Sequence, residues 1–303
     1  MTAPRSLTVE LLLLALLATL WGASYTFIKL GVATIPPVTF IAARTLIAAL
    51  ILLTVLRMRG LRLPRDRTTW KRFAIQAALN SVMPFTLIAW AELTIDAGLA
   101  AIINSTTPIF TFLLTLVLTR HEPSSLRKFF GVLAGMIGIC LIIGVEALNG
   151  VGRELLAQLA MLVATVSYAG AAIFGRNFKD LDPMMPAAGS MLCGAAILIP
   201  LSLVVDQPWT LSPSTSSLLA LLGLAVFSTA LAFCIFFRLV NTLGSVGTTA
   251  QAYLRVPIGV AIGALFLSER LTDTAWIGLV CVVAGVAAMT IPRRKHNATA
   301  VTS

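Results

Sequence analysis

Charged residues are scarce in this chain, and their scarcity decides its broad class. Only 11% of the 303 residues are Asp, Glu, Lys or Arg, whereas 58% are hydrophobic. Soluble domains carry roughly 25% charged residues. The chain therefore lacks the polar residues needed to cover a water-soluble surface. The composition predicts an all-α membrane protein, because helices satisfy their own backbone hydrogen bonds in lipid.

Groups that usually carry catalysis or bind metals are scarce as well. The two histidines, His121 and His296, lie in polar connections, and the four cysteines lie singly in apolar segments without CxxC spacing. No HExxH, phosphate-binding-loop or GxSxG motif occurs. These absences argue against an enzyme, a metal site, a bound cofactor and an ATP-driven pump in this chain.

Long apolar runs are abundant, and about 20 such residues suffice for a helix to cross the hydrocarbon core. The sequence predicts ten of these helices. They cover residues 8–28, 37–56, 73–92, 97–118, 129–147, 154–175, 184–205, 217–239, 245–267 and 274–291. The first run is longer than the apolar region of about 7–15 residues in a signal peptide. We therefore expect it to remain as a transmembrane helix.

Lys and Arg residues concentrate on one side of the predicted membrane. With the N-terminus in the cytoplasm, 17 of the 22 lie on the cytoplasmic side. Only Lys29, Arg153 and Arg270 lie outside, and Arg44 and Arg255 fall within helices. Such a bias predicts that both termini are cytoplasmic, with the protein in the inner (plasma) membrane. The basic residues in short connections also argue against nucleic-acid binding, despite the pI of about 10.2.

The connection from residue 57 to residue 72 holds seven of these basic residues and one Asp. Its charge is typical of topology control and of contact with anionic lipid headgroups.

The two halves of the chain resemble each other at an offset of 147 residues. The matches pair Pro36 with Pro183, Trp21 with Tyr168, Lys29 with Arg176, Glu122 with Glu269, Gly131 with Gly278 and Gly138 with Gly285. A local slip of two residues also pairs Pro108 with Pro257. Because each unit has five helices, the second enters the membrane from the opposite side. We predict inverted repeats at 1–147 and 148–292, followed by a cytoplasmic tail at 293–303. Secondary transporters are commonly built this way, and some channels are too.

Several motifs resemble those of one family. They are the stretch Trp21-Gly22-Ala23-Ser24-Tyr25, Pro37 followed by Arg44, the run Trp90-Ala91-Glu92 to Asn104 and Pro108, Glu122 followed by Gly131 and Gly138, and Pro257 followed by Leu267-Ser268-Glu269. The chain resembles the ten-helix, EamA-domain branch of the drug/metabolite transporter superfamily. The resemblance implies a transporter of amino acids, metabolites or drugs. It also implies a cavity lined by helices one to four and six to nine, with helices five and ten at the periphery.

Two intramembrane arginines are candidates for substrate binding or gating. Arg255 lies about eleven residues into its predicted helix, roughly 16 Å deep, with Gln251 on the same face. A charge at that depth must face protein or water, so Arg255 is predicted to bind an anionic substrate group, or else backbone carbonyls near Pro257. Arg44 and Glu92 are at similar depths and are expected to form an ion pair, either as a structural contact or as an outer gate. Glu92 is also the best candidate for a proton-carrying side chain.

Aromatic and amide side chains complete the predicted site. Trp21, Tyr25 and Tyr168 lie on helices that the resemblance places around the cavity, and Asn80 and Asn104 add amide groups. Each of them also has an alternative interpretation as ordinary packing. Pro108 and Pro257 are predicted to kink matched helices near the site. Gly131, Gly138, Gly278 and Gly285 are expected to form close-packing helix surfaces, within one chain or between two.

Together these features predict an exporter of amino acids or related metabolites that works by alternating access. Its partners would be a small-molecule substrate, the bilayer and protons as a coupling ion, and it would be a monomer or a homodimer. The alternatives are a facilitative channel-like pore and a drug efflux transporter of the same fold.

Overall fold

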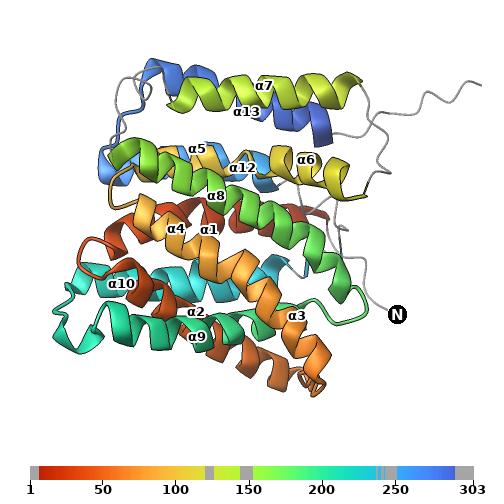
Figure 1. Ribbon diagram of the computed structural model, residues 1–303, viewed down its shortest axis with the longest axis vertical. Helices are drawn as coiled ribbons and strands as arrows, with labels where there is room; N and C mark the ends of the chain where they lie inside the picture. Colours follow the sequence, from red (N-terminus) through yellow and green to blue (C-terminus); the bar gives the residue numbers. More distant parts are fainter. Residues whose placement is uncertain are drawn as a thin grey trace, which may run out of the picture.

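The chain folds into a bundle of long helices joined by short connections (Figure 1). This computed structural model describes residues 7–119, 126–143, 153–236, 238, 239, 242 and 251–290. The first half comprises α1 (Leu7–Gly31), α2 (Pro37–Met58), α3 (Arg67–Ala77), η1 (Ala78–Val82), α4 (Met83–Ala91), α5 (Ala97–Asn104), α6 (Thr107–Thr119) and α7 (Leu126–Ile143). The second comprises α8 (Arg153–Phe174), η3 (Gly175–Phe178), α9 (Met184–Val205), η4 (Pro208–Thr210), α10 (Thr215–Ala225), η5 (Val226–Leu231), α12 (Gln251–Leu267) and α13 (Asp273–Thr290).

Some of these elements join into longer segments. The π-helical turn η1 links α3 to α4 without a break, and the π-helical turn η5 continues α10 as far as residue 236. Residues 105 and 106 separate α5 from α6 by a single turn. Joined in this way, the described residues form ten successive helical segments, close to the predicted ranges. The largest difference is in the third segment, which begins at Arg67 rather than at residue 73.

The surfaces of these segments are suited to lipid. Within the described residues, seven spans are long and apolar enough to cross a membrane: Thr8–Gly31, Pro37–Met58, Arg67–Ala91, Ala97–Val117, Arg153–Phe178, Met184–Val205 and Thr215–Phe236. Large apolar side chains remain exposed on them, as with Val117 at 73% and Leu219 at 63%. Contiguous apolar surface of this kind is rare on soluble monomers. The protein is an all-α, multi-pass membrane protein.

Helices from the two halves pack against each other throughout the bundle. α2 packs along α9, α1 along α12 and α10, and α8 along α4 and α6. The pair α7 and α13 forms a separate layer at the top of Figure 1. This agrees with the peripheral position expected for the fifth and tenth helices.

Glycines allow α7 and α13 to approach closely. A Cβ atom added to Gly138 would lie 2.7 Å from the carbonyl oxygen of Gly278, and one added to Gly285 would lie 2.5 Å from that of Gly131. Neither crossing has room for a side chain. The glycine pattern read from the sequence therefore serves packing within one chain.

Candidate functional site

A buried polar pair lies where α1 meets α5. The Nδ2 atom of Asn104 donates a hydrogen bond to the Tyr25 hydroxyl at 2.5 Å, and both side chains are 4% exposed. Asn104 is the last residue of α5, and the Thr107 hydroxyl donates to its carbonyl oxygen at 2.7 Å. Pro108 has no backbone N–H to offer that carbonyl, which accounts for the break after α5. The interruption thus places Asn104 at a helix end inside the bundle.

Gly22 allows α12 to pack against α1 close to the Tyr25–Asn104 pair. A Cβ atom on Gly22 would lie 3.0 Å from the carbonyl oxygen of Arg255 and 3.1 Å from the nitrogen of Gly259. The small residue thus lets the backbones of α1 and α12 touch one turn from Tyr25, and it explains the glycine in the Trp21–Tyr25 motif. Unlike the break near Pro108, α12 continues through Pro257 without an interruption.

Arg44 forms the centre of a second group. Its Nε donates to the Thr229 hydroxyl at 3.0 Å, and its guanidinium carbon lies 3.8 Å from the ring centroid of Phe85. Tyr168 contacts the same ring edge-to-face, with centroids 6.3 Å apart. The row Thr229–Arg44–Phe85–Tyr168 therefore crosses η5, α2, α4 and α8. A desolvated cation on an aromatic face is stabilised by the ring quadrupole.

The two groups share one electrostatic environment. Arg44 and Arg255 both lie within electrostatic range of the Tyr25 and Tyr168 hydroxyls. Arg44 is 5% exposed and Arg255 is half-buried. Among the described residues, neither guanidinium forms an ion pair with a carboxylate. The Glu92 carboxyl lies within the same electrostatic range of Arg44 and Tyr25. The centre of the bundle thus holds two cations, two phenols, one amide and one carboxyl group, and its excess of positive charge suits a carboxylate-bearing ligand.

The expected ion pair between Arg44 and Glu92 is wrong. Arg44 turns toward Thr229 and Phe85, and neither carboxylate oxygen of Glu92 has a hydrogen-bond partner among the described residues. Lys29 lies beside Glu92 instead, and its Nζ donates to the carbonyl oxygens of Glu92 at 2.8 Å and of Ile95 at 2.7 Å. Sequence position predicted similar depths for Arg44 and Glu92 but not the direction in which each side chain points.

The remaining candidates lie around this centre. Trp21 packs on Phe236 and Phe233, with ring centroids 5.5 Å and 6.2 Å away, in a smaller apolar cluster between α1 and the end of the eighth segment. Gln251 is 7% exposed, and its Oε1 has no hydrogen-bond partner in the described part of the chain. Asn80 is half-buried within η1.

Sequence reasoning missed several residues that position the site. Phe85 and Thr229 hold Arg44, and neither carries a pattern in the sequence. Glu269 accepts hydrogen bonds from the N–H groups of Ala97 at 2.7 Å and Gly98 at 2.8 Å, at the start of α5. The match between Glu269 and Glu122 across the repeat was the sequence signal that could have indicated this role. Residue 122 lies outside the described residues.

A bundle of membrane-length helices around a buried polar cluster defines the class of multi-pass membrane proteins. Comparison with known families then identifies the group within that class. A model of the EamA-like transporter family matches residues 8–144 and again residues 155–291. The chain belongs to this family. It is a membrane transporter that contains two EamA units, and the family is not one of enzymes.

Relatives match along most of the chain. The "Uncharacterized inner membrane transporter YedA" of Escherichia coli is 27% identical over 90% of this chain and 87% of its own. The "Uncharacterized transporter YoaV" of Bacillus subtilis is 25% identical over 91% and 95%. The "Probable amino-acid metabolite efflux pump" of Escherichia coli is 25% identical over 89% and 91%. A solved crystal structure shares the fold with a TM-score of 0.65 at 17% identity, covering 95% of this chain and 98% of that one.

Proposed function

We propose that this protein is a secondary transporter that exports amino acids or related carboxylate-bearing metabolites by alternating access. The observation that carries the proposal is the pair of guanidiniums, Arg44 and Arg255, without carboxylate partners among the described residues and close to Tyr25 and Tyr168. Arg44 is buried and Arg255 half-buried, and the carboxyl group of Glu92, within electrostatic range of Arg44, forms no direct ion pair with it. A cation inside the bundle without a direct ion pair is costly, and a substrate carboxylate would relieve that cost. The printed name of one relative, a probable amino-acid metabolite efflux pump, supports the same substrate class.

In this proposal the ten segments all cross the inner membrane, with both termini in the cytoplasm. The units 1–147 and 148–292 are inverted repeats, and 293–303 is a cytoplasmic tail. The packing supports the repeat, because contacts occur in pairs that the repeat would exchange, and the odd number of helices per unit makes the second copy inverted. The contact of α1 with α12 corresponds to that of α8 with α6, and the contact of α1 with α10 corresponds to that of α8 with α4.

Matched π-helical turns support the repeat as well. The turn at residues 78–82 would fall on residues 225–229 at the offset of 147, and the second turn covers residues 226–231. Irregular turns of this kind are frequent at functional sites. In the proposed mechanism the halves rock about the centre formed by Arg44, Arg255, Tyr25 and Asn104. Trp21, Gln251 and Asn80 extend the substrate path on either side.

Glu92 is the proposed proton-carrying side chain. It is 1% exposed, and its carboxylate oxygens are unbonded within the described residues. A channel of the same fold would instead conduct without saturation or counter-transport. A drug efflux transporter would tolerate loss of the arginines, because its substrates need no carboxylate.

The function can be tested with purified protein in proteoliposomes. A screen of labelled amino acids and organic acids, with and without a pH gradient, is expected to reveal saturable transport of a carboxylate-bearing solute. Arg255→Gln should remove that transport while leaving membrane insertion intact, because the neutral amide cannot neutralise the substrate charge. Arg153→Gln is the control, since Arg153 is exposed at the start of α8 and belongs to neither polar group. Unchanged transport in Arg255→Gln would remove Arg255 from the site.

A further inference from the structure

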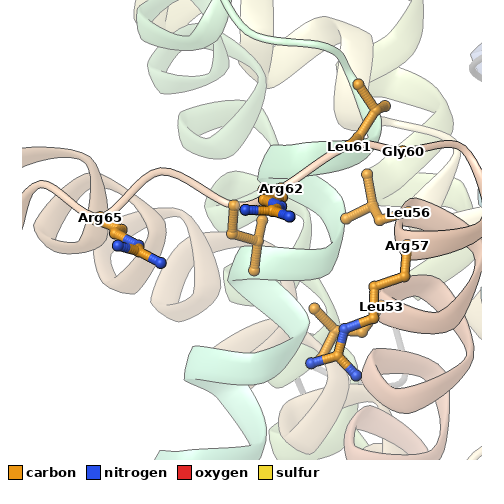
Figure 2. Close-up of a pocket in the computed structure, with 8 residues that line it drawn as sticks. Leu53, Leu56, Arg57, Gly60, Leu61, Arg62 and Arg65 are labelled. Atoms are coloured by element: carbon orange, nitrogen blue, oxygen red, sulfur yellow. The ribbon is translucent and has the colours of Figure 1, made fainter.

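The connection between α2 and α3 encloses a pocket that is separate from the transport site. Its volume is about 560 Å³, and its walls combine basic and apolar side chains (Figure 2). The lining residues are Leu53, Leu56, Arg57, Gly60, Leu61, Arg62, Leu63 and Arg65. Three guanidiniums therefore share one hollow with four leucine side chains. This mixed lining suits a ligand with an anionic end and an apolar end.

Hydrogen bonds within the connection and to the adjoining helices fix its conformation. α2 ends at Met58 with Arg59 as its C-cap, and Gly60 follows with a φ of 71° that glycine adopts more readily than other residues. The Leu61 N–H donates to the carbonyl oxygen of Leu56 at 3.0 Å. At the other end, the Asp66 carboxylate accepts from the Thr69 N–H at 2.7 Å and caps α3. The Trp70 indole N–H donates to the carbonyl oxygen of Pro64 at 2.9 Å. None of these bonds uses a pocket arginine.

The three pocket arginines also lack counter-ions. Within the described part of the chain, none of Arg57, Arg62 and Arg65 forms an ion pair. Asp66 is the acidic residue nearest in sequence, and its carboxylate accepts the Thr69 N–H instead of pairing with a pocket arginine. Arg59 points elsewhere, toward Asp182 at 3.9 Å. All three are exposed, and an anion bound between them would be attracted by each.

The leucine side chains favour a lipid over a soluble anion as the ligand of this pocket. Leu56 is 1% exposed and packs in the core, whereas Leu53, Leu61 and Leu63 are half-buried and supply the apolar surface beside the arginines, next to the end of a helix of membrane-spanning length. Basic pockets at the ends of transmembrane helices are suited to anionic headgroups. We propose that this pocket binds the phosphate of an anionic phospholipid, with the arginines on the phosphate oxygens and the leucines along the first carbons of the acyl chains.

The test compares lipid binding by purified protein in detergent. Native mass spectrometry would measure binding of short-chain phosphatidylglycerol, of phosphatidylcholine and of inorganic phosphate. The expected result is a preference for phosphatidylglycerol that the triple variant Arg57→Gln, Arg62→Gln, Arg65→Gln reduces by at least about tenfold. The matched control is Arg67→Gln, Lys71→Gln, Arg72→Gln, which removes the same charge from α3 outside the pocket. This control should keep the preference.

Three results would overturn the proposal. An equal loss of preference in both triple variants would indicate only a general effect of charge. Inorganic phosphate that displaced phosphatidylglycerol would indicate a site for a soluble anion. If the pocket triple variant does not insert, the three single variants answer the question, and binding unchanged in all of them would exclude the pocket. Lipid binding is measured without substrate, so failure of the transport proposal would leave this one unaffected.

Discussion

At the scale of single residues, Arg44 shows what a sequence can and cannot predict about an intramembrane charge. Its depth follows from counting residues along the helix, because each adds 1.5 Å. Its partners depend on rotation of α2 about its axis, and that rotation is set by packing against α9 and α10. The predicted partner, Glu92, was therefore wrong, whereas Tyr25 and Asn104 were predicted individually and do lie together.

Arg44→Met separates a structural role from a transport role. The change introduces the residue found at the repeat-equivalent position, Met191, which is fully buried. Replacing a buried charge with an apolar side chain of similar size is often neutral or stabilising. We expect thermal unfolding at an unchanged or higher temperature, together with loss of carboxylate transport. Met191→Leu serves as the control. A clear fall in unfolding temperature with transport preserved would show that Arg44 is structural.

Glu92→Gln tests proton coupling. The carboxyl is buried beside Lys29 without a hydrogen bond to its oxygens in the described residues, so a proton is one way to remove its charge. The amide cannot take up a proton, and we expect transport by the variant to lose its dependence on pH. Initial rates in proteoliposomes across a pH series measure this. An unchanged pH profile, with exposed Glu154→Gln as the comparison, would exclude Glu92 as the proton carrier.

At the scale of elements, helix existence was predictable, but helix irregularity was not. Apolar length alone predicts each crossing, since no shorter helix spans the hydrocarbon core. The π-helical turns are accompanied instead by side-chain hydrogen bonds to backbone carbonyls, one from another helix and one local. The Ser167 hydroxyl of α8 donates to the carbonyl oxygen of Leu79 in η1 at 2.8 Å, and the Thr229 hydroxyl donates to that of Leu224 at 2.8 Å. These hydroxyl groups supply hydrogen bonds to carbonyl oxygens that the irregular turn displaces from the regular helix pattern. The pattern of apolar residues in the sequence does not predict such bonds.

Carboxylates from one half cap helices of the other, at ends that the proposed topology places outside. Glu269 caps α5, and Asp206 accepts from the N–H of Thr39 at 2.7 Å near the start of α2. Each bond satisfies a helix N–H that has no partner within its own helix.

Glu269→Ala is expected to destabilise the protein by about 0.5–2 kcal/mol, the usual cost of losing a helix cap. The loss should appear as a lower unfolding temperature in detergent. Glu269→Gln, which keeps one acceptor oxygen, should lose less, and exposed Asp180→Ala should lose little. Equal stability of Glu269→Ala and the wild-type protein would mean that water replaces the cap without cost.

At the scale of the whole molecule, the proposed inversion of the repeat predicts that equivalent connections lie on opposite faces of the membrane. The connections after α2 and after α9 are such a pair, because these helices occupy equivalent places in the two units. Thr68 is exposed in the first turn of α3, directly after the first connection, and Trp209 in the second connection is 68% exposed. Of the features of the amino-acid composition, only the bias of Lys and Arg toward one side of the membrane supports this prediction.

Single cysteines at these two positions, in a background without the native cysteines, test the arrangement. A membrane-impermeant thiol reagent added to intact cells should label Trp209→Cys and leave Thr68→Cys unlabelled until the membrane is opened. Labelling of both residues from one side would contradict the inversion. Labelling of Thr68→Cys alone would keep the inversion but reverse the orientation.

The glycine crossing between α7 and α13 has a consequence for mutational scanning. At Gly138 and Gly285 every substitution adds at least a Cβ atom where the opposing backbone leaves no space. These positions should therefore tolerate almost no replacement, although α7 and α13 form a layer set apart from α2, the helix that carries Arg44 (Figure 1). A map of intolerant positions would thus highlight two regions of this protein. Only a screen that scores abundance in the membrane separately from transport would tell which of them selects the substrate.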